Sequence, residues 1–472
     1  MLEHLLDEYA RSGMLPMHTP GHKRNGAFAG LLPYSLDITE IEGFDDLYNA
    51  KGVLAETMAL AARLYGSRRA YLGVNGSTGC ILAAVYAAAG PGDTVIVARN
   101  CHRSVYHALE IVRARPVFVM PEVDAETGIA GSFKPEAVEK SLESARGARL
   151  VIVTSPTYEG VVSDVRSICE TAHRHGAVVL VDAAHGAHLG FHPAFPESPV
   201  ACGADMVAMS LHKTLPAMTQ TALLHLCSER VDAQRLAQAM RMFCTSSPSY
   251  VLMASIDRCL RLLESEGGAL FARYSEALRR FSARARELQH LRVLCHGRDD
   301  IGRHSAFFGF DPGKIVVDTR GAGLTGPEFA SRLREAHKIE TEMASLGYVL
   351  AMTSVCDDDL VLTRLSDALF ALDGAARPER EISVPPDVFS LPEMKMDLAE
   401  AAWAEGSFVP IKNAAGKAAL EYVWAYPPGI PVLIPGEVVT GKALEALLTL
   451  EKSGVSVYSS RGGWPEGLYC VT

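Results

Sequence analysis

The sequence lacks the features that mark several large classes of proteins. Its ten cysteines form no CxxC pair, which argues against a zinc knuckle or a redox pair and favours reduced thiols. Apolar runs such as ILAAVYAAA reach about half of the ~20 residues that a membrane helix needs. The first residues, MLEHLLDEYARSG, carry acids where a signal peptide would have a basic region before an apolar run. We therefore expect a cytoplasmic protein without a membrane anchor.

An excess of positive charge and a disordered tail are also missing. The 45 Lys and Arg residues face 55 Asp and Glu residues, for a net charge of −10, whereas a nucleic-acid surface needs a basic face. Hydrophobic residues form 48% of the 472 residues, and no segment combines strong charge with low hydrophobicity. This composition predicts a globular chain of two or three domains that does not bind nucleic acid.

Short β-branched runs alternate with helical segments between about Tyr71 and Leu226. The expected strands are TVIVA, PVFVM, VIVT, AVVLVD, MVAMS and ALLHL. Their alternation with helices predicts an α/β fold with a mixed, mostly parallel sheet that is covered on both faces. Active sites of such sheets gather at the carboxyl ends of the strands.

The pattern then changes twice, which predicts a chain of several parts. A long helical period from about Ser255 to Leu291 favours a helix leaving the large domain, and the Pro-containing segment RPEREISVPPDVF marks a second boundary. The expected parts are an N-terminal arm (1–45), a cofactor-binding large domain (46–290), a small α+β domain (291–375) and a C-terminal domain (385–472).

A carboxylate and a lysine follow two of the expected strands. Asp182 ends AVVLVD, and Lys213 follows MVAMS in the tetrad Ser210-Leu211-His212-Lys213. Pyridoxal phosphate (PLP) needs this pair, because a lysine amine holds the cofactor as a Schiff base and a carboxylate keeps the pyridine nitrogen protonated. The two residues therefore predict a PLP site.

The segment LGVNGSTGCILAAV predicts the phosphate site, because its Gly/Ser/Thr turn leads into an apolar helix whose first N–H groups can face an anion. Ser77 and Thr78, after Gly76, are the expected ligands. Ser210 and His212 can add donors from the lysine segment. His102, after the strand TVIVA, is placed to stack on the pyridine ring.

Each of these residues alone has a simpler interpretation, such as a surface lysine, a helix-capping aspartate or a polar loop histidine. Their order on alternating strands favours the PLP site. Two other patterns do not carry a function: His185, His188 and His192 lack a converging carboxylate or thiolate for a metal, and GEVVTGKA has Ala443 where a P-loop needs a hydroxyl.

Nine segments in fixed order span nearly the whole chain, and several are specific. They are MHTPGHK, DITEIEGFDDL, NGSTG, RNCHRS, SPTYEG, DAAHGAH, SLHKT, TSSPSYVLMASID and YPPGIPVLIPGE. They resemble the Orn/Lys/Arg decarboxylase family of PLP enzymes of fold type I, which has an aspartate-aminotransferase-like large domain. The chain length is similar to the shorter bacterial members, which lack an N-terminal wing domain.

The resemblance implies a role for each matching position. It implies that the cofactor site lies at the interface of a homodimer or larger homo-oligomer, with Thr245 and Ser246 reaching the phosphate of the neighbouring subunit's cofactor. The implied positions within one subunit are Lys213 for the Schiff base, Asp182 for the pyridinium, His102 for stacking, His185 beside the cofactor, and the Gly76 turn with Ser77, Thr78, Ser210 and His212 for phosphate.

The resemblance also implies decarboxylation of a basic amino acid, which would give CO2 and a di- or polyamine from ornithine, lysine or arginine. A cationic side chain needs acidic partners, and Glu42, Asp45 and Glu342 are candidates. Two alternatives stay open: another PLP reaction, such as transamination or elimination, and a non-catalytic PLP-binding relative. Residue types do not distinguish the three substrates.

Two segments depart from the family pattern. Shorter members often carry DEAHGAH, whereas this chain has Ala183 in place of the acid, which puts the local polarity in doubt. The segment AMTSVCDDD stands where many relatives have a Thr-Thr-x-Gly-Asp ending, and this difference is expected to affect the substrate end of the site.

Overall fold

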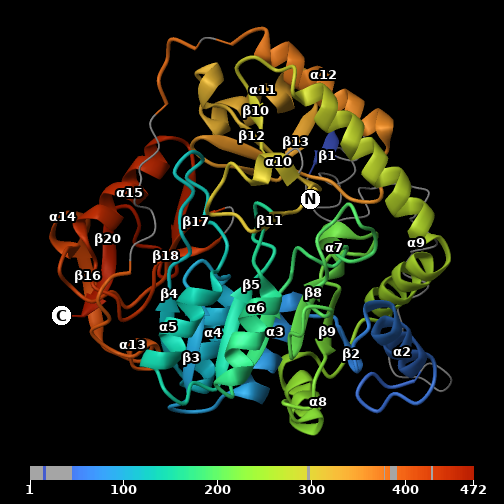
Figure 1. The fold of residues 1–472 in the computed structure, drawn as a ribbon. Helices are drawn as coiled ribbons and strands as arrows, with labels where there is room; N and C mark the ends of the chain where they lie inside the picture. The colour runs from blue at the N-terminus through green and yellow to red at the C-terminus, as the bar shows by residue number, and fades with distance from the viewer. Residues whose placement is uncertain are drawn as a thin grey trace.

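A seven-stranded sheet forms the centre of the computed structural model, which describes residues 14–17, 45–294, 298–376, 378–382, 391–426 and 429–471 (Figure 1). No helix among these residues is long and apolar enough to span a bilayer. The strands, in their order across the sheet, are β2 (Arg69–Gly73), β9 (Ala222–Leu226), β8 (Met206–Ser210), β7 (Val178–Asp182), β5 (Leu150–Thr154), β3 (Thr94–Ala98) and β4 (Arg115–Val119).

The large sheet is mixed and mostly parallel, as predicted. Strands β4, β3, β5, β7 and β8 run parallel, whereas β9 is antiparallel to both β8 and β2. The central strands are continuous apolar runs because helices cover both faces. The six strands expected from the sequence are confirmed to within about one residue at their ends.

Two groups of helices cover the faces of this sheet. One face packs on α3 (Gly76–Ala88), α4 (Arg103–Val112) and α8 (Ala233–Phe243). The other packs on α2 (Val53–Tyr65), α5 (Pro135–Ser144), α6 (Val165–Arg174) and the 36-residue α9 (Tyr250–Ala285). Alternate strand residues point to each group, so two apolar layers hold the strand ends in fixed positions.

A second, antiparallel sheet lies above the carboxyl ends of the large sheet in Figure 1. The loop after β5 joins the two parts, because β6 (Val161–Val162) pairs with β11 (Gly309–Phe310). Helix α11 (Gly326–His337) and α12 (Asp359–Asp373) flank the second sheet, and β1 (Leu15–Met17) pairs with β13 (Ile339–Thr341). Its strands are β10 (Arg292–Val293), β12 (Lys314–Asp318), β15 (Tyr348–Met352) and β14 (Met343–Ala344).

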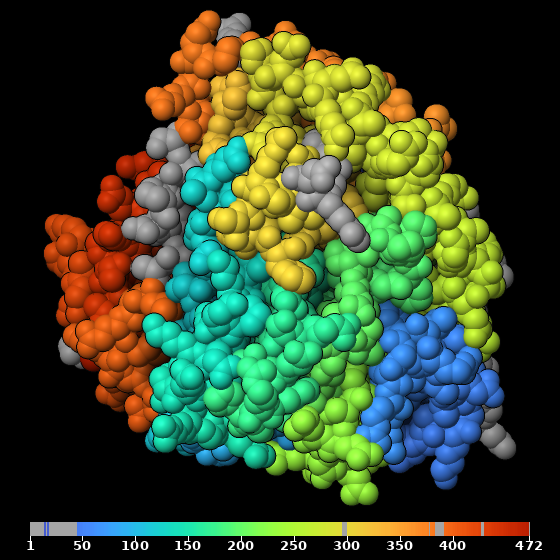
Figure 2. All heavy atoms as spheres, in the orientation of Figure 1, coloured from blue at the N-terminus to red at the C-terminus, as the bar shows by residue number. Residues whose placement is uncertain are grey.

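The C-terminal residues, orange to red in Figure 2, lie beside the residues of the large sheet and form two further small sheets. Their helices are α13 (Leu398–Ala401), α14 (Ile411–Ala414) and α15 (Gly441–Lys452). The domain boundaries expected near residues 290 and 385 stay predictions. The strands are β16 (Gly406–Pro410) with β20 (Gly467–Val471), and β17 (Val423–Tyr426) between β18 (Pro431–Leu433) and β19 (Ser456–Ser459).

A buried ion pair connects the C-terminal residues to the large sheet. The guanidinium of Arg99, directly after β3, donates to Glu437 through Nε at 3.2 Å and Nη2 at 3.0 Å. It also donates to the hydroxyl of Tyr106 at 2.7 Å and to the carbonyl oxygen of Pro431 at 2.7 Å. Because both charged side chains are almost fully buried, each depends on the other for its solvation.

We predict that Arg99→Met or Glu437→Gln will lower the free energy of unfolding by roughly 3–5 kcal/mol, because either change leaves a buried charge without its partner. All three tryptophans lie between residues 403 and 464. Urea unfolding followed by tryptophan fluorescence therefore reports on the C-terminal residues.

The matched control is Arg68→Ala, which breaks the exposed ion pair with Glu229. Such pairs contribute about 0–1 kcal/mol, so its transition should lie close to that of the unchanged protein. Equal effects of the buried and exposed changes would contradict the stabilising role of the Arg99–Glu437 pair.

Candidate active site

Asp182 and Lys213 lie at the carboxyl edge of the large sheet. Asp182 ends β7 opposite Ala208 of β8, and β8 leads directly into the one-turn helix α7 (Leu211–Thr214), which carries Lys213. Burial raises the pKa of Asp182, and the positive charge of Lys213 opposes this shift. Burial likewise lowers the pKa of Lys213, against the charges of Asp182 and Glu342. The two groups therefore influence each other inside a buried site.

His185 links Lys213 to a second lysine. Its Nε2 lies 3.0 Å from Lys213 Nζ, and its Nδ1 lies 2.7 Å from Lys314 Nζ. The ring of Tyr158 meets the imidazole edge-on, with 4.7 Å between the ring centres. Burial and the two lysine charges hold the pKa of His185 well below its usual range. The imidazole is therefore neutral at neutral pH.

His102 caps the first turn of α4. Its Nδ1 accepts from the backbone N–H of Ser104 at 3.2 Å and lies 2.8 Å from the Ser104 hydroxyl. Burial, together with the charge of Lys213, lowers the pKa of His102 to about 3. A neutral, fixed imidazole near Lys213 suits the stacking role expected from the sequence.

The Gly76 turn opens α3, as expected for a phosphate site. Gly76 has a φ of +65°, which favours glycine, and its N–H donates to the carbonyl of Gln220 at 2.8 Å. The first N–H groups of a helix, here those near Ser77 and Thr78, have no acceptor within the helix. The Ser210 hydroxyl donates to the Ser77 hydroxyl at 3.0 Å, so the lysine segment and the turn are neighbours.

His212 is partly buried beside Lys213, and its Nδ1 lies 3.0 Å from the carbonyl oxygen of Thr221. A contact of His212 with the phosphate stays a prediction. Thr245 and Ser246 are exposed between α8 and α9, and the Thr245 carbonyl accepts from the Tyr48 hydroxyl at 2.5 Å. Their contact with a neighbouring subunit stays a prediction.

The three acidic candidates for the substrate end differ in their surroundings. Glu42 lies outside the described residues. The Asp45 carboxylate accepts backbone N–H groups of Lys51 and Gly52 before α2, at 2.9 and 2.7 Å, which favours a capping role over a substrate contact. The half-buried Glu342 accepts from the Tyr158 hydroxyl at 2.5 Å. Of these three acids, Glu342 is the one that lies near Lys213 and Lys314.

Three residues of the cluster were not predicted from the sequence. Lys314 lies in the expected small α+β domain (291–375), where no lysine had a predicted role. Tyr158 and Glu159 belong to SPTYEG, which contributed to the family resemblance without a role for either residue. The buried Glu159 accepts from the Tyr348 hydroxyl at 2.9 Å. The match to SPTYEG is the signal that could have identified Tyr158 and Glu159.

The two departures from the family pattern lie close to this cluster. Ala183 is fully buried in the apolar layer on the α6 face, directly after Asp182. In AMTSVCDDD, Met352 Sδ lies 3.4 Å from Lys314 Nζ, whereas Asp358 caps α12 by accepting from the backbone N–H of Val361. The second departure therefore touches the cluster through Met352 at the end of β15.

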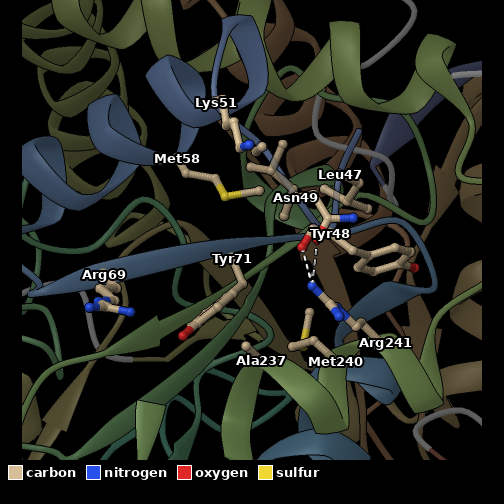
Figure 3. Close-up of a pocket in the computed structure, with 12 residues that line it drawn as sticks. Leu47, Tyr48, Asn49, Lys51, Met58, Arg69, Tyr71, Ala237, Met240 and Arg241 are labelled. Carbon is tan, nitrogen blue, oxygen red and sulfur yellow. Dashed lines mark hydrogen bonds between the residues drawn. The ribbon is translucent and has the colours of Figure 1, made fainter. Parts of the chain in front are cut away.

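A separate cavity of about 390 Å³ lies between the loop before α2, β2 and α8 (Figure 3). Its lining includes Lys51, Arg69 and Arg241, but no carboxylate. Arg241 is held there by the carbonyl oxygen of Tyr48, at 2.5 Å, and by Asn49 Oδ1, at 3.0 Å. This positive lining does not suit the cationic end of a basic amino acid.

The residues around Lys213 fit PLP. In the part of the chain that the structure describes, the buried Asp182 carboxylate accepts one hydrogen bond, from the Ala184 N–H at 3.1 Å. A pyridinium N–H would supply the cationic partner that a buried carboxylate needs. The helix start at Gly76 and the Ser77 and Ser210 hydroxyls provide donors of the kind that phosphate binds. The predicted set thus supplies a lysine, a carboxylate and an anion site.

The histidines His185 and His188, which could suggest a metal, have other partners. His188 Nε2 lies 3.1 Å from Asp311, and His185 lies between the two lysines. Among the described residues, no group of three His, Cys, Asp or Glu side chains is arranged to hold a metal ion.

Comparisons with known proteins identify the family that this arrangement resembles. The model of the Orn/Lys/Arg decarboxylase major domain matches residues 2–321, and that of the C-terminal domain matches residues 387–456. An arginine decarboxylase from Bacillus anthracis is 32% identical over 461 residues, which cover 96% of this chain and 93% of the relative. The similarity therefore extends over both chains.

Solved structures share the fold. Lysine decarboxylase A from Pseudomonas aeruginosa superposes with a TM-score of 0.77 at 21% identity, covering 99% of this chain and 80% of the other. An alanine–glyoxylate aminotransferase from Nostoc superposes with a TM-score of 0.54 at 16% identity, covering 67% and 85%. The predicted fold type I architecture is thus confirmed, and PLP is the cofactor of this fold and family.

We predict that Lys213→Ala will abolish the visible absorption band of the PLP-loaded protein, because no other amine is expected to hold the cofactor. Absorption spectra after addition of PLP and dialysis test this expectation. The matched control is Lys134→Ala, which removes a partly exposed lysine paired with Glu122 and should leave the band unchanged. A band that persists in the Lys213 variant would assign the cofactor to another lysine.

Proposed function

The chain belongs to the Orn/Lys/Arg decarboxylase family, and from this we propose that it removes the α-carboxylate of a basic amino acid, with arginine as the first candidate. Membership makes it a PLP-dependent amino-acid decarboxylase. The observation that carries the choice of a basic substrate is Glu342, an acid near Lys213 at the edge of the site. Arginine comes first because full-length relatives at 32% identity are named arginine decarboxylases.

Each residue of the cluster has a task in this reaction. When bound, PLP supplies a conjugated ring that accepts the electron pair left by the departing carboxylate. Lys213 holds the cofactor, and its amine can carry the proton that replaces CO2 on the α-carbon. Asp182 holds negative charge in the buried site, where it stabilises a cationic partner. His102 and His185 are neutral and fixed, so they pack and position without adding charge.

The acids at the other end of the cluster suit a cationic side chain. Glu342 and Glu159 come from different parts of the chain, and tyrosine hydroxyls bind both, at 2.5 Å from Tyr158 and 2.9 Å from Tyr348. These bonds fix the positions of the carboxylate oxygens. A guanidinium or ammonium group would then find oriented acceptors, which favour charge-assisted hydrogen bonds. The product would be the corresponding di- or polyamine.

Incubation of the PLP-loaded protein with arginine, lysine, ornithine and alanine tests the proposal. We expect CO2 and amine in equal amounts from at least one basic amino acid, with arginine preferred, and none from alanine. A keto acid instead of CO2 would indicate transamination. The absence of any turnover, with the visible band intact, would indicate a non-catalytic PLP-binding relative.

Glu342→Gln tests the substrate end, because the amide keeps the shape of the side chain and removes its charge. We expect KM for the preferred basic amino acid to rise about 10-fold, the value of one charge-assisted hydrogen bond. The matched control is Glu340→Gln, which affects the exposed pair with Arg334 and should change KM little. Equal KM values in all three proteins would remove Glu342 from the substrate site.

We further propose a cytoplasmic homodimer with shared sites. The exposed Thr245 and Ser246 support the shared site, and the nine described cysteines are free, which suits a reducing compartment.

Mixing Lys213→Ala subunits with Thr245→Val/Ser246→Ala subunits tests the sharing. Random exchange should restore up to about a quarter of the original activity, since half of the dimers would contain one intact site. Activity no greater than the sum of the separate variants would contradict a shared site.

A further inference from the structure

Lys314 is a buried lysine whose amine contacts an imidazole. It begins β12 with 2% exposure, and its Nζ lies 2.7 Å from His185 Nδ1 and 3.4 Å from Met352 Sδ. Within the described chain no carboxylate is in hydrogen-bond contact with this amine. Lysines are almost never fully buried unless they are paired, and the usual partner of a buried charge is an acid. A structural role alone therefore does not explain its position.

The backbone around Lys314 aims the amine at His185. Gly160 has a φ of +106°, and a Cβ there would lie 2.7 Å from Cβ and Cγ of Lys314. The N–H of Asp311 donates to the Gly160 carbonyl at 2.8 Å, and the N–H of Lys314 donates to the Asp311 carbonyl at 3.0 Å. Only a glycine at position 160 leaves room for the lysine stem along this path.

The contacts of His185 restrict where its neighbours can hold protons. A neutral imidazole carries one hydrogen, so it donates from one nitrogen and accepts at the other. One of Lys213 and Lys314 must therefore accept a hydrogen bond from the ring, which only an uncharged amine can do. Both lysines cannot be ammonium groups at once in this arrangement. While His185 is neutral, at most one of the two lysines is therefore an ammonium group.

We propose that Lys314 is a positioning residue that holds a proton for the decarboxylation proposed above and passes it through His185 to Lys213. Lys314 donates to Nδ1, which keeps the ring hydrogen on Nε2, facing Lys213. In the transfer, an N–H bond of Lys314 breaks as the Nδ1–H bond forms. The Nε2–H bond breaks as a new bond to Lys213 Nζ forms, and no electrons are exchanged. After Lys213 has given its proton to the α-carbon, Lys213 takes a new proton from water in the substrate site. The return transfer then breaks an N–H bond of Lys213 as the Nε2–H bond re-forms, and it breaks the Nδ1–H bond as Lys314 regains its proton, which restores the starting tautomer.

The charges around Lys314 suit this task. Burial lowers its pKa to about 7, while nearby acids raise the pKa and Lys213 lowers it. An amine with a pKa near neutrality both gives and regains a proton. The groups that face it are Asp311 in the turn before β12, Glu342 between β13 and β14, Glu159 and Tyr158 after β5, His185 after β7, and Lys213 in α7.

The tautomer of His185 in the full-length protein without PLP, where Lys213 is a free amine, tests the positioning role without any substrate. ¹⁵N NMR of histidine-labelled protein, with the His185 signals assigned by their loss in His185→Gln, should show the hydrogen on Nε2. In Lys314→Met the hydrogen should move to Nδ1, because Lys213 then donates to Nε2. Lys314→Arg should keep it on Nε2. An unchanged tautomer in Lys314→Met would overturn the proposal, whether or not the protein releases CO2.

The pH profile of kcat tests the proton transfer. The Lys314 ammonium group exists below about pH 7, so kcat should fall as the pH rises through this value. Lys314→Met should lower kcat roughly 100-fold with little change in KM, the usual range for loss of a proton donor. Lys314→Arg should also be slow and should lack the fall near pH 7, because a guanidinium keeps its proton.

Full activity of Lys314→Arg would overturn the transfer, because a fixed cation would then suffice. The matched control is Lys140→Met, the same substitution at an exposed lysine of α5, away from the cluster. It should leave the His185 tautomer, KM and the pH profile unchanged. Because the NMR measurement needs no turnover, a failure of the decarboxylase proposal would not be mistaken for a failure of this one.

Discussion

The electrostatic interaction of Asp182 and Lys213 in a buried site is the constraint on which the rest of the arrangement depends. Burial disfavours the charged form of each residue, and the opposite charge of the other favours it. Adjacent parallel strands hold the two residues at one edge of the sheet, where apolar layers on both faces fix the strand ends. The surrounding polar groups then add to the balance of charge around this pair.

Those balancing groups come from outside the large sheet. Lys314 begins β12 of the second sheet, and Glu342 lies between β13 and β14, whereas Asp182 ends β7 of the large sheet and Lys213 follows β8 in α7. The pairing of β6 with β11 holds the two parts together at this point. The chemistry of the site therefore depends on the relative placement of two sheets, and the long helix α9 connects them along the chain.

The ends of the strands could be predicted from the sequence because they depend on the pattern of neighbouring residues. The runs before Asp182, Lys213 and His102 identify themselves as strands, and parallel strands bring their carboxyl ends to one edge. The position of Lys314 could not be predicted, because it is in contact with a histidine 129 positions away and lysines are usually exposed. Likewise, Asp45 has the residue type of a substrate partner, but its backbone contacts indicate a cap.

The Arg99–Glu437 pair makes the segment after β3 dependent on the C-terminal residues. His102 lies three positions after Arg99, so the segment that carries a predicted cofactor contact also carries the contact with a distant part of the chain. Removal of the C-terminal residues would therefore take away both the acid and the carbonyl oxygens that bind this guanidinium. A truncation made to isolate the large domain would thus alter the segment that holds His102 as well.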